Sequence, residues 1–197
     1  MSVRFFIGSA EIVLRFWFFV SAALFAMISN QPIVLFVALP ILIHELGHIL
    51  ALLVCGVRIR SVVFGLVSVD IVRHSGMMET AKESLVGMGG VAANLLAASV
   101  LYMFSPGETI RPLIYTNIAI AAFNLLPIRG LDGGNLAALF CEKFFFPYAA
   151  LIISKAISFA ALVPLFGVSI WLLWEGYGNF SLLFCCVYLA ARILREQ

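Results

Sequence analysis

The stretch ILIHELGHILAL, residues 41–52, places two histidines and a glutamate inside a run of otherwise apolar residues. Ionisable side chains are costly at membrane depth, so they indicate function when they occur within a transmembrane segment. The rest of the chain is apolar as well, because 63% of its 197 residues are hydrophobic and 11% are charged, with a mean hydropathy of +1.12. A soluble domain has about 25% charged residues. The composition therefore predicts an integral, multi-pass membrane protein.

Six apolar segments each approach the length of about 20 residues that a helix needs to cross a bilayer. These segments are 12–29, 33–55, 84–104, 112–128, 150–173 and 179–194. We therefore expect an all-α polytopic membrane protein in which the whole chain, 1–197, forms one transmembrane domain. Residues 131–146 are expected to form a further helix that is partly buried or lies at the membrane interface.

The basic residues predict the orientation of these spans, because cytoplasmic loops carry an excess of Lys and Arg. If the N-terminus is cytoplasmic, ten basic residues fall on or near the inner side: Arg4, Arg15, Arg58, Arg60, Arg73, Lys82, Arg129, Lys143, Arg192 and Arg195. Only Arg111 falls clearly on the outer side. Both termini are therefore expected in the cytoplasm. The formal net charge of +2 gives no indication of nucleic-acid binding.

His44 and His48 are four residues apart, which places both imidazoles on one face of a helix, where a single metal ion can bind both. Glu45 lies beside them, close enough to activate a water molecule but not placed to be a third ligand. Zinc suits imidazole ligands, and catalytic zinc sites have three protein ligands and one position for water. Two of only three histidines lie here, so the motif predicts one zinc ion per chain rather than a pair of core histidines.

A second motif, FNLLPIRGLDGG at 123–134, interrupts the fourth apolar segment. Pro127 cannot donate a backbone hydrogen bond, and glycines such as Gly133 loosen the helix further. Asp132 lies in this break and is the best candidate for the third zinc ligand, although it could instead cap the next helix. Asn124 could hydrogen-bond a bound backbone or a developing oxyanion, or it could form a helix–helix hydrogen bond.

Together, the two motifs resemble the signature of the site-2 protease family of intramembrane zinc metalloproteases. HELGH at 44–48 is followed two spans later by N-x-x-P-x-x-x-x-D-G at 124–133. The phrase NLLPI-x-x-LDGG, the short N-terminal span and the position of HELGH in the second span are most similar to the sporulation branch. The enzymes of that branch have six spans and release a membrane-tethered sigma-factor precursor in spore-forming bacteria.

The resemblance implies that His44, His48 and Asp132 bind zinc. It also implies that Glu45 activates water, and Asn124 matches the family's Asn. The expected activity is hydrolysis of a peptide bond in or near the transmembrane segment of a membrane-tethered protein. The expected location is a bacterial type of cytoplasmic membrane, with the site opening to the cytoplasm. The expected partners are that substrate, the lipid bilayer and a membrane regulatory or inhibitory protein.

The chain departs from the family pattern at two places. Gly130 precedes the LDGG sequence where the family often has Pro, and the segment from Gly90 to Asn94 lacks the Pro that commonly follows the glycine. Gly90 and Asn94 are expected to have structural roles. Gly90, together with Gly89, Ala93 and Ala97, is small enough to let helices approach closely. Many sporulation members carry a C-terminal nucleotide-sensing module. No such regulatory domain is expected here, because the sixth expected span ends three residues before residue 197.

Residues 57–73 are rich in β-branched residues and partly alternate around Gly65, which predicts a membrane-associated β hairpin. An unpaired edge of this hairpin could receive an extended peptide as an added strand. Alternatively, the hairpin could simply close the cavity at the interface.

Three other functions remain compatible with the histidine pair. Another membrane-embedded zinc endopeptidase would take its third ligand from a Glu on a later helix, for which Glu142 is the candidate. A non-catalytic metal-binding membrane scaffold would have no need of Glu45 as a base. A metal transporter would require further histidines or carboxylates along a path, and the spans lack them.

Overall fold

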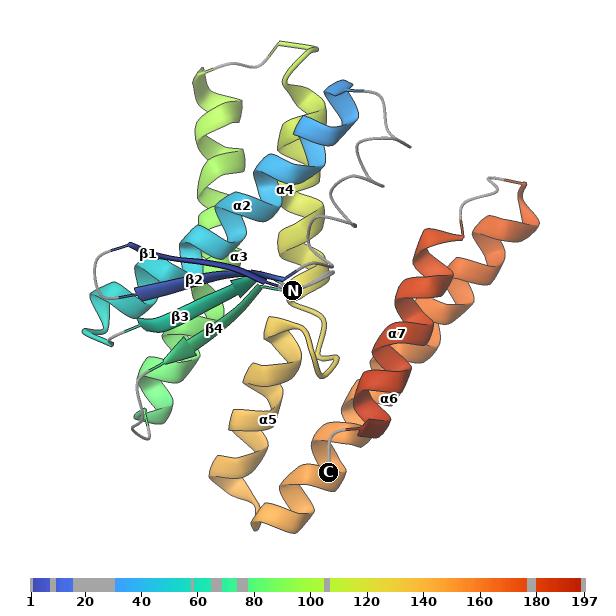
Figure 1. The fold of residues 1–197 in the computed structure, drawn as a ribbon. Helices are drawn as coiled ribbons and strands as arrows, with labels where there is room; N and C mark the ends of the chain where they lie inside the picture. Colours follow the sequence, from blue (N-terminus) through green and yellow to red (C-terminus); the bar gives the residue numbers. More distant parts are fainter. Residues whose placement is uncertain are drawn as a thin grey trace. The chain divides into compact units, whose positions relative to one another are not determined.

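The computed structural model describes residues 2–7, 10–15, 31–57, 59–64, 69–73, 78–104, 107–176 and 180–195. Within these ranges the chain forms four strands and six helices, and most of the residues are helical (Figure 1). The chain divides into two compact units, residues 1–121 and 122–197, and each unit is described by itself. A single domain over 1–197 stays a prediction.

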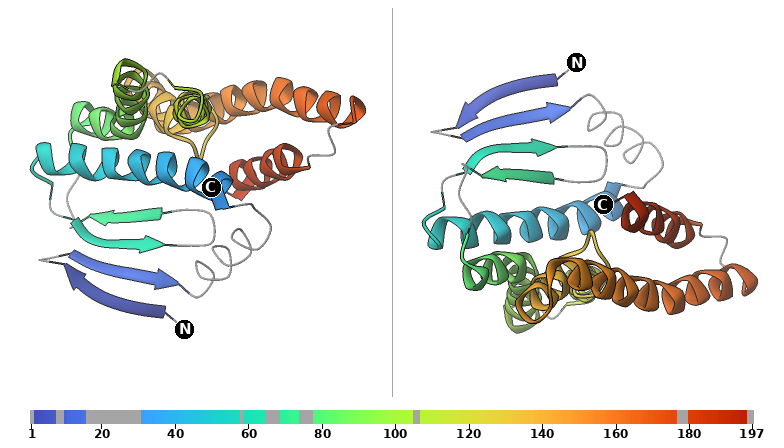
Figure 2. Two further views of the ribbon diagram at one scale, coloured as in Figure 1. Left: turned by 90° about the horizontal axis from the view of Figure 1, so that it is seen from above. Right: turned by 90° about the horizontal axis from the view of Figure 1, so that it is seen from below.

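The first unit contains a four-stranded sheet with the strand order β1-β2-β3-β4 (Figure 2). The strands are β1 (Ser2–Ile7), β2 (Ala10–Arg15), β3 (Ile59–Phe64) and β4 (Val69–Arg73). β1 and β2 are antiparallel, as are β3 and β4, whereas β2 and β3 are parallel. Parallel neighbours need a crossover connection. That connection contains α2 (Gln31–Val54), so the helix with the HELGH motif lies within the crossover between two adjacent strands.

The hairpin expected at 57–73 is confirmed as β3 and β4, but these strands are only half of the sheet. The first expected span, 12–29, is wrong at its start, because residues 12–15 belong to β2. Residues 16–29 of that span lie outside the described residues. The expectation of an all-α protein with one hairpin is therefore corrected to a mostly helical protein with a four-stranded sheet.

Charged residues in the N-terminal segment explain this difference. Arg4 and Glu11 lie on adjacent strands, with the Arg4 guanidinium 3.5 Å from the Glu11 carboxylate. A partly exposed ion pair of this kind adds little stability, but it is compatible with a strand at an interface and not with a helix in lipid. The apolar residues of β2 continue in sequence into those after Arg15, so a hydropathy pattern merges the strand with the residues C-terminal to it.

Among the described residues, three helices are long and apolar enough to cross a membrane, namely Leu35–Val54 of α2, Thr80–Phe104 (α3) and Pro147–Trp174 (α6). They agree with the second, third and fifth expected spans. The helices α4 (Arg111–Asn124) and α7 (Ser181–Arg195) have 14 and 15 residues. Both are shorter than the expected spans 112–128 and 179–194, and six membrane-crossing helices are not confirmed in the described part of the chain.

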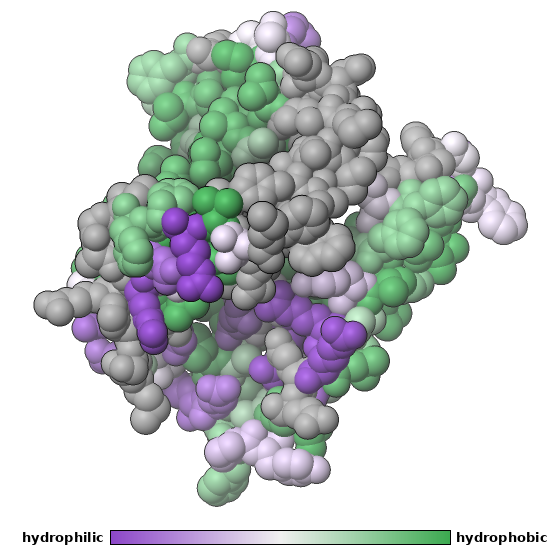
Figure 3. Space-filling model, in the orientation of Figure 1, coloured by the Kyte–Doolittle hydropathy of each residue, from purple (hydrophilic) through white to green (hydrophobic). Residues whose placement is uncertain are grey.

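The helices expose many large apolar side chains. On α3 alone, the exposed set is Leu85, Met88, Leu95, Leu96, Val100, Tyr102, Met103 and Phe104. Figure 3 shows hydrophobic surface over α3 and over α6 and α7, and hydrophilic residues near the strands and α5. Large exposed apolar patches mark membrane or protein contacts, and three helices of membrane-crossing length make lipid the natural neighbour here.

In the second unit, a loop of residues 125–131 leads from α4 into α5 (Asp132–Phe144), which confirms the helix expected at 131–146. This loop is part of a hydrophobic core rather than a surface connection. The core joins two residues of the loop to residues of α6 and α7: Ile128, Leu131, Leu162, Cys186, Leu189 and Ile193. The second sequence motif is therefore fixed by packing against α6 and α7.

Candidate metal centre

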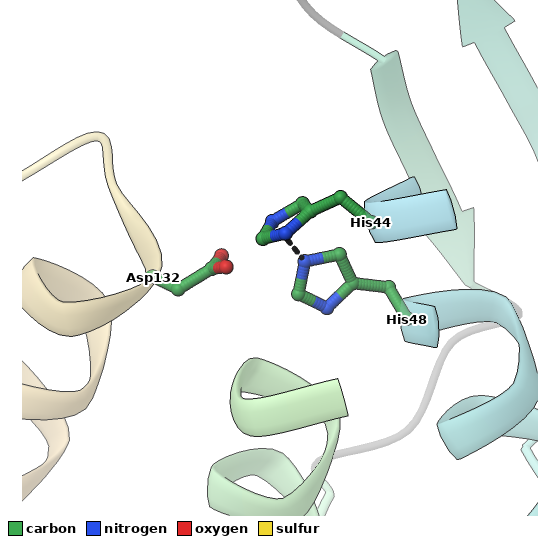
Figure 4. A group of neighbouring side chains, drawn as sticks. All are labelled: His44, His48 and Asp132. Carbon is green, nitrogen blue, oxygen red and sulfur yellow. Dashed lines mark hydrogen bonds between the residues drawn. The ribbon is translucent and has the colours of Figure 1, made fainter. Parts of the chain in front are cut away.

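α2 brings the imidazoles of His44 and His48 together on one face, as their spacing predicts. Their Nε2 atoms are 3.2 Å apart, and the two rings meet edge to face at 82° (Figure 4). His44 is 6% exposed and His48 is partly buried. Two imidazoles therefore present the same nitrogen to the same point in a largely apolar setting.

A hydrogen bond to α3 determines which nitrogen of His48 is available. The Nδ1 atom of His48 lies 2.8 Å from the carbonyl oxygen of Val86. A carbonyl oxygen can only accept a hydrogen bond, so Nδ1 carries the proton. In the neutral imidazole, Nε2 is then the nitrogen with the lone pair, and this nitrogen faces Nε2 of His44, with which it forms a hydrogen bond. Such a bond to the second ring nitrogen is the usual way in which proteins orient a metal-binding histidine.

The spacing of the two nitrogens fits a zinc ion. Two nitrogens that each lie about 2.0–2.1 Å from a tetrahedral zinc are about 3.3 Å apart. The Nε2 atoms of His44 and His48 are separated by 3.2 Å. Little movement of α2 is therefore needed for both imidazoles to hold one zinc ion.

α3 contacts this part of α2 through residues spaced four apart. Val86 accepts from His48, Gly90 lies against both imidazoles, and the Nδ2 of Asn94 donates to the carbonyl of Pro40 at 3.1 Å. Going along α3 in steps of one turn, the contacts on α2 move back from His48 to His44 to Pro40, also in steps of one turn. The two helices therefore run antiparallel. Asn94 is fully buried, and this hydrogen bond fixes the register of α3 on α2. The structural role expected for Asn94 is consistent with this contact.

Gly90 leaves the space that the two nitrogens occupy. A Cβ atom at this position would lie 2.5 Å from Nε2 of His48 and 2.7 Å from Nε2 of His44. The backbones of α2 and α3 also touch at Gly47 and Gly89, where a Cβ on either residue would collide with the backbone of the other. Glycine at these positions permits the close approach that membrane helices use.

Glu45 follows His44 on α2 and is partly exposed. Its place on the helix puts it beside the imidazole pair without aligning it with them, because adjacent residues on a helix do not share a face. Glu45 is therefore next to the histidines in the helix and partly accessible.

Asp132 is the first residue of α5 and is partly buried. The N-cap position belongs to Leu131, which has an extended backbone and makes no side-chain cap hydrogen bond. The alternative in which Asp132 is the N-cap residue is therefore not the arrangement observed. A carboxylate in the first helical turn is stabilised by the helix dipole.

The loop before Asp132 is tightly folded, with Pro127 following the end of α4. A Cβ at Gly133 would collide with the carbonyl of Leu125, and one at Gly134 with the carbonyl of Ile128. The two glycines of the LDGG sequence therefore let the first turn of α5 pack directly on this loop. This packing gives the predicted structural role of Gly133 its physical basis.

The other candidate residues lie at the ends of helices. Asn124 is the last residue of α4 and is partly exposed. Glu142, the alternative third ligand, is exposed near the end of α5, ten residues after Asp132. Ten residues correspond to about 15 Å along a helix. Glu142 therefore lies on a different turn, well away from the start of α5.

Comparison with solved structures identifies a protein with a similar fold. The chain is similar to the site-2 protease from Methanocaldococcus jannaschii, with a TM-score of 0.68 and 18% sequence identity, over 100% of this chain and 95% of that chain. At this level of identity the similarity shows a shared fold. No protein-family model matches the chain, and the search of curated proteins gives no match. The resemblance seen in the two motifs is thus confirmed as a similarity of fold.

The contacts from α3 are the part of the site that sequence reasoning missed. Nothing in the sequence marks the carbonyl of Val86 as a hydrogen-bond acceptor for His48. The signal that was available is the spacing of Gly90 and Asn94, which are four residues apart like His44 and His48.

Replacement of Gly90 by Ala is expected to push the two imidazoles apart, since the new methyl group would occupy the space beside both Nε2 atoms. We expect zinc affinity to fall by about tenfold or more, in the range seen when the surroundings of metal ligands are altered. Chelator competition on the purified protein measures this. Gly167→Ala is the matched control, because a Cβ there meets nothing within 4 Å. Equal zinc affinity in both variants would contradict the proposed geometry.

Proposed function

We propose that this chain is an intramembrane zinc metalloprotease that hydrolyses a peptide bond in or near the transmembrane segment of a membrane-tethered protein. The observation that carries the proposal is the pair of Nε2 atoms, 3.2 Å apart, on a helix long and apolar enough to cross a membrane. The fold shared with a site-2 protease supports it.

In this proposal His44, His48 and Asp132 hold one zinc ion per chain. Each offers one ligand atom of a type that zinc accepts, an imidazole nitrogen or a carboxylate oxygen. Asp132 is supported as the third ligand by its place in the first turn of α5, at a helix break that the LDGG glycines pack tightly. When bound, zinc supplies Lewis acidity to a water molecule and to the scissile carbonyl.

The residues of the chain then carry out the proton transfers. The Glu45 carboxylate takes a proton from the attacking water, whose oxygen forms a bond to the carbonyl carbon. Glu45 gives that proton to the amine nitrogen as the C–N bond breaks, so the carboxylate is regenerated. The Asn124 amide donates a hydrogen bond to the substrate backbone or to the carbonyl oxygen as its negative charge develops.

An extended substrate is needed for this chemistry, because a helix hides its carbonyls in its own hydrogen bonds. Among the described strands, β1 and β4 lie at the edges of the sheet, and β4 belongs to the hairpin that comes after α2. We propose that an extended segment of the substrate can add to this sheet as a further strand. The simpler alternative is a hairpin that only closes the cavity. Substrates truncated in the extended segment would distinguish the two arrangements, because only strand addition requires that segment.

The substrate class and the location follow from the same proposal. The basic residues favour cytoplasmic termini and a site that opens to the cytoplasm of a bacterial type of membrane. A sigma-factor precursor is the candidate substrate suggested by the similarity of NLLPIRGLDGG to the sporulation branch. A membrane protein that covers the site would be its natural regulator, since water must reach the zinc for the reaction to proceed.

Replacement of Glu45 by Gln is expected to abolish cleavage and to leave zinc content unchanged, because the amide cannot accept the proton. Wild type and variant would be co-expressed with a panel of membrane-tethered substrates, and zinc would be measured in the same purified samples. Glu175→Gln, at the exposed end of α6, is the control and should retain both properties. Undiminished cleavage by the Glu45 variant would exclude the proposed mechanism.

Replacement of Asp132 by Asn tests the third ligand separately. The amide is nearly the same size but is a poor zinc ligand, so we expect zinc affinity to fall by at least about tenfold while the protein stays folded. Zinc affinity and the thermal unfolding temperature are the two measurements. Unchanged zinc affinity would show that Asp132 serves only the start of α5, and would direct attention to Glu142 as the ligand.

A further inference from the structure

Arg129, three residues before Asp132, connects the loop of residues 125–131 to α6. Its Nη1 donates to the Oγ of Ser154 at 2.9 Å, and its backbone N–H donates to the Oγ of Ser158 at 3.0 Å. Both serines are almost completely buried, with 2% and 1% exposure. The loop is thus hydrogen-bonded to two buried hydroxyl groups one turn apart on a largely apolar helix.

Both hydroxyl groups are also bound within α6. The Oγ of Ser154 donates to the carbonyl of Leu151 at 3.1 Å, and the Oγ of Ser158 donates to the carbonyl of Ser154 at 2.8 Å. A hydroxyl has one proton to donate and two lone pairs to accept with. Each serine therefore donates to its own helix and accepts from Arg129, which makes α6 an acceptor surface for this loop.

The residues beside Arg129 are fixed as well. Ile128 is completely buried in the core formed with α6 and α7. Gly130 has φ +99°, a backbone conformation that favours glycine, and a Cβ there would lie 2.8 Å from the Cδ of Arg192 on α7. The chain therefore has little freedom between Ile128 and the first residue of α5.

We propose that Arg129 is a positioning residue of the zinc site, which docks the loop on Ser154 and Ser158 and thereby fixes where Asp132 begins α5. This inference rests on the proposed role of Asp132 as a zinc ligand. It gives Arg129 a function beyond that of a basic residue on the cytoplasmic side. It also makes the two serines of α6 part of the support of the zinc site, although neither touches the metal.

Removal of the two acceptors tests this without changing any charge. Ser154→Ala combined with Ser158→Ala keeps Arg129 in place, whereas Arg129→Met removes the side-chain donor and Arg129→Lys keeps the charge. Ser169→Ala is the matched control. Ser169 is equally buried on α6 and donates to the carbonyl of Phe166 at 2.7 Å. It lies 11 residues beyond Ser158, about 16 Å along the helix.

Two measurements on the full chain in detergent decide the outcome. Amide hydrogen exchange of residues 125–134 in the zinc-free protein reports docking of the loop, and chelator competition reports zinc affinity. We expect the double serine variant and Arg129→Met to speed exchange in this loop but not in α2 or α3. We expect both to weaken zinc binding by about tenfold, as changes to the supports of metal ligands do. Arg129→Lys should recover part of the loss, and Ser169→Ala should match wild type.

Two results would overturn the proposal. Unchanged exchange in the loop would show that Arg129 does not dock it, and faster exchange with wild-type zinc affinity would show that docking does not position Asp132. Failure of the proposed function is distinguishable from both. If wild type bound no zinc, the positioning role would fall with the proposed function, while loop exchange in the variants would still decide the docking itself.

Discussion

The hydrogen bond between Nδ1 of His48 and the carbonyl of Val86 is the interaction on which the candidate site depends most. It assigns the proton of His48 to Nδ1 and so leaves the Nε2 lone pair facing His44. The bond can form only because α3 lies very close to α2. That approach in turn requires glycine at residues 47, 89 and 90. The HELGH motif on α2 thus needs a glycine-rich face on α3.

The position of α2 in the fold follows from a second constraint. β2 and β3 are parallel neighbours, and a parallel pair requires a crossover of a dozen or more residues. α2 lies within that crossover, so the strands before and after it are tied to one sheet. The helix that contains His44, Glu45 and His48 therefore lies in sequence between two neighbouring strands of one sheet. In the second unit, packing of Ile128 and Leu131 against α6 and α7 fixes the loop that leads into α5.

Parts of this arrangement can be predicted from sequence because they depend on local spacing. The four-residue step between His44 and His48 predicts their meeting on one face, and the β-branched residues of 57–73 predict the hairpin. The sheet as a whole cannot be predicted in that way, since Glu11 pairs with Ser61, fifty residues later. Hydropathy also overestimates the length of two spans, because the apolar helices α4 and α7 have only 14 and 15 residues. The register of α3 on α2, set by Asn94 and Pro40, depends on packing between segments that sequence does not place together.

X-ray absorption at the zinc edge of the purified full chain tests the central claim most directly, since it counts and identifies the atoms around the metal. The proposed centre predicts one zinc per chain, with nitrogen and oxygen neighbours at about 2.0–2.2 Å and the outer-shell scattering of two imidazoles. A shell of sulfur neighbours at about 2.3 Å would instead assign the metal to cysteines. That result, or a protein that binds no zinc, would contradict the assignment of His44 and His48 as ligands.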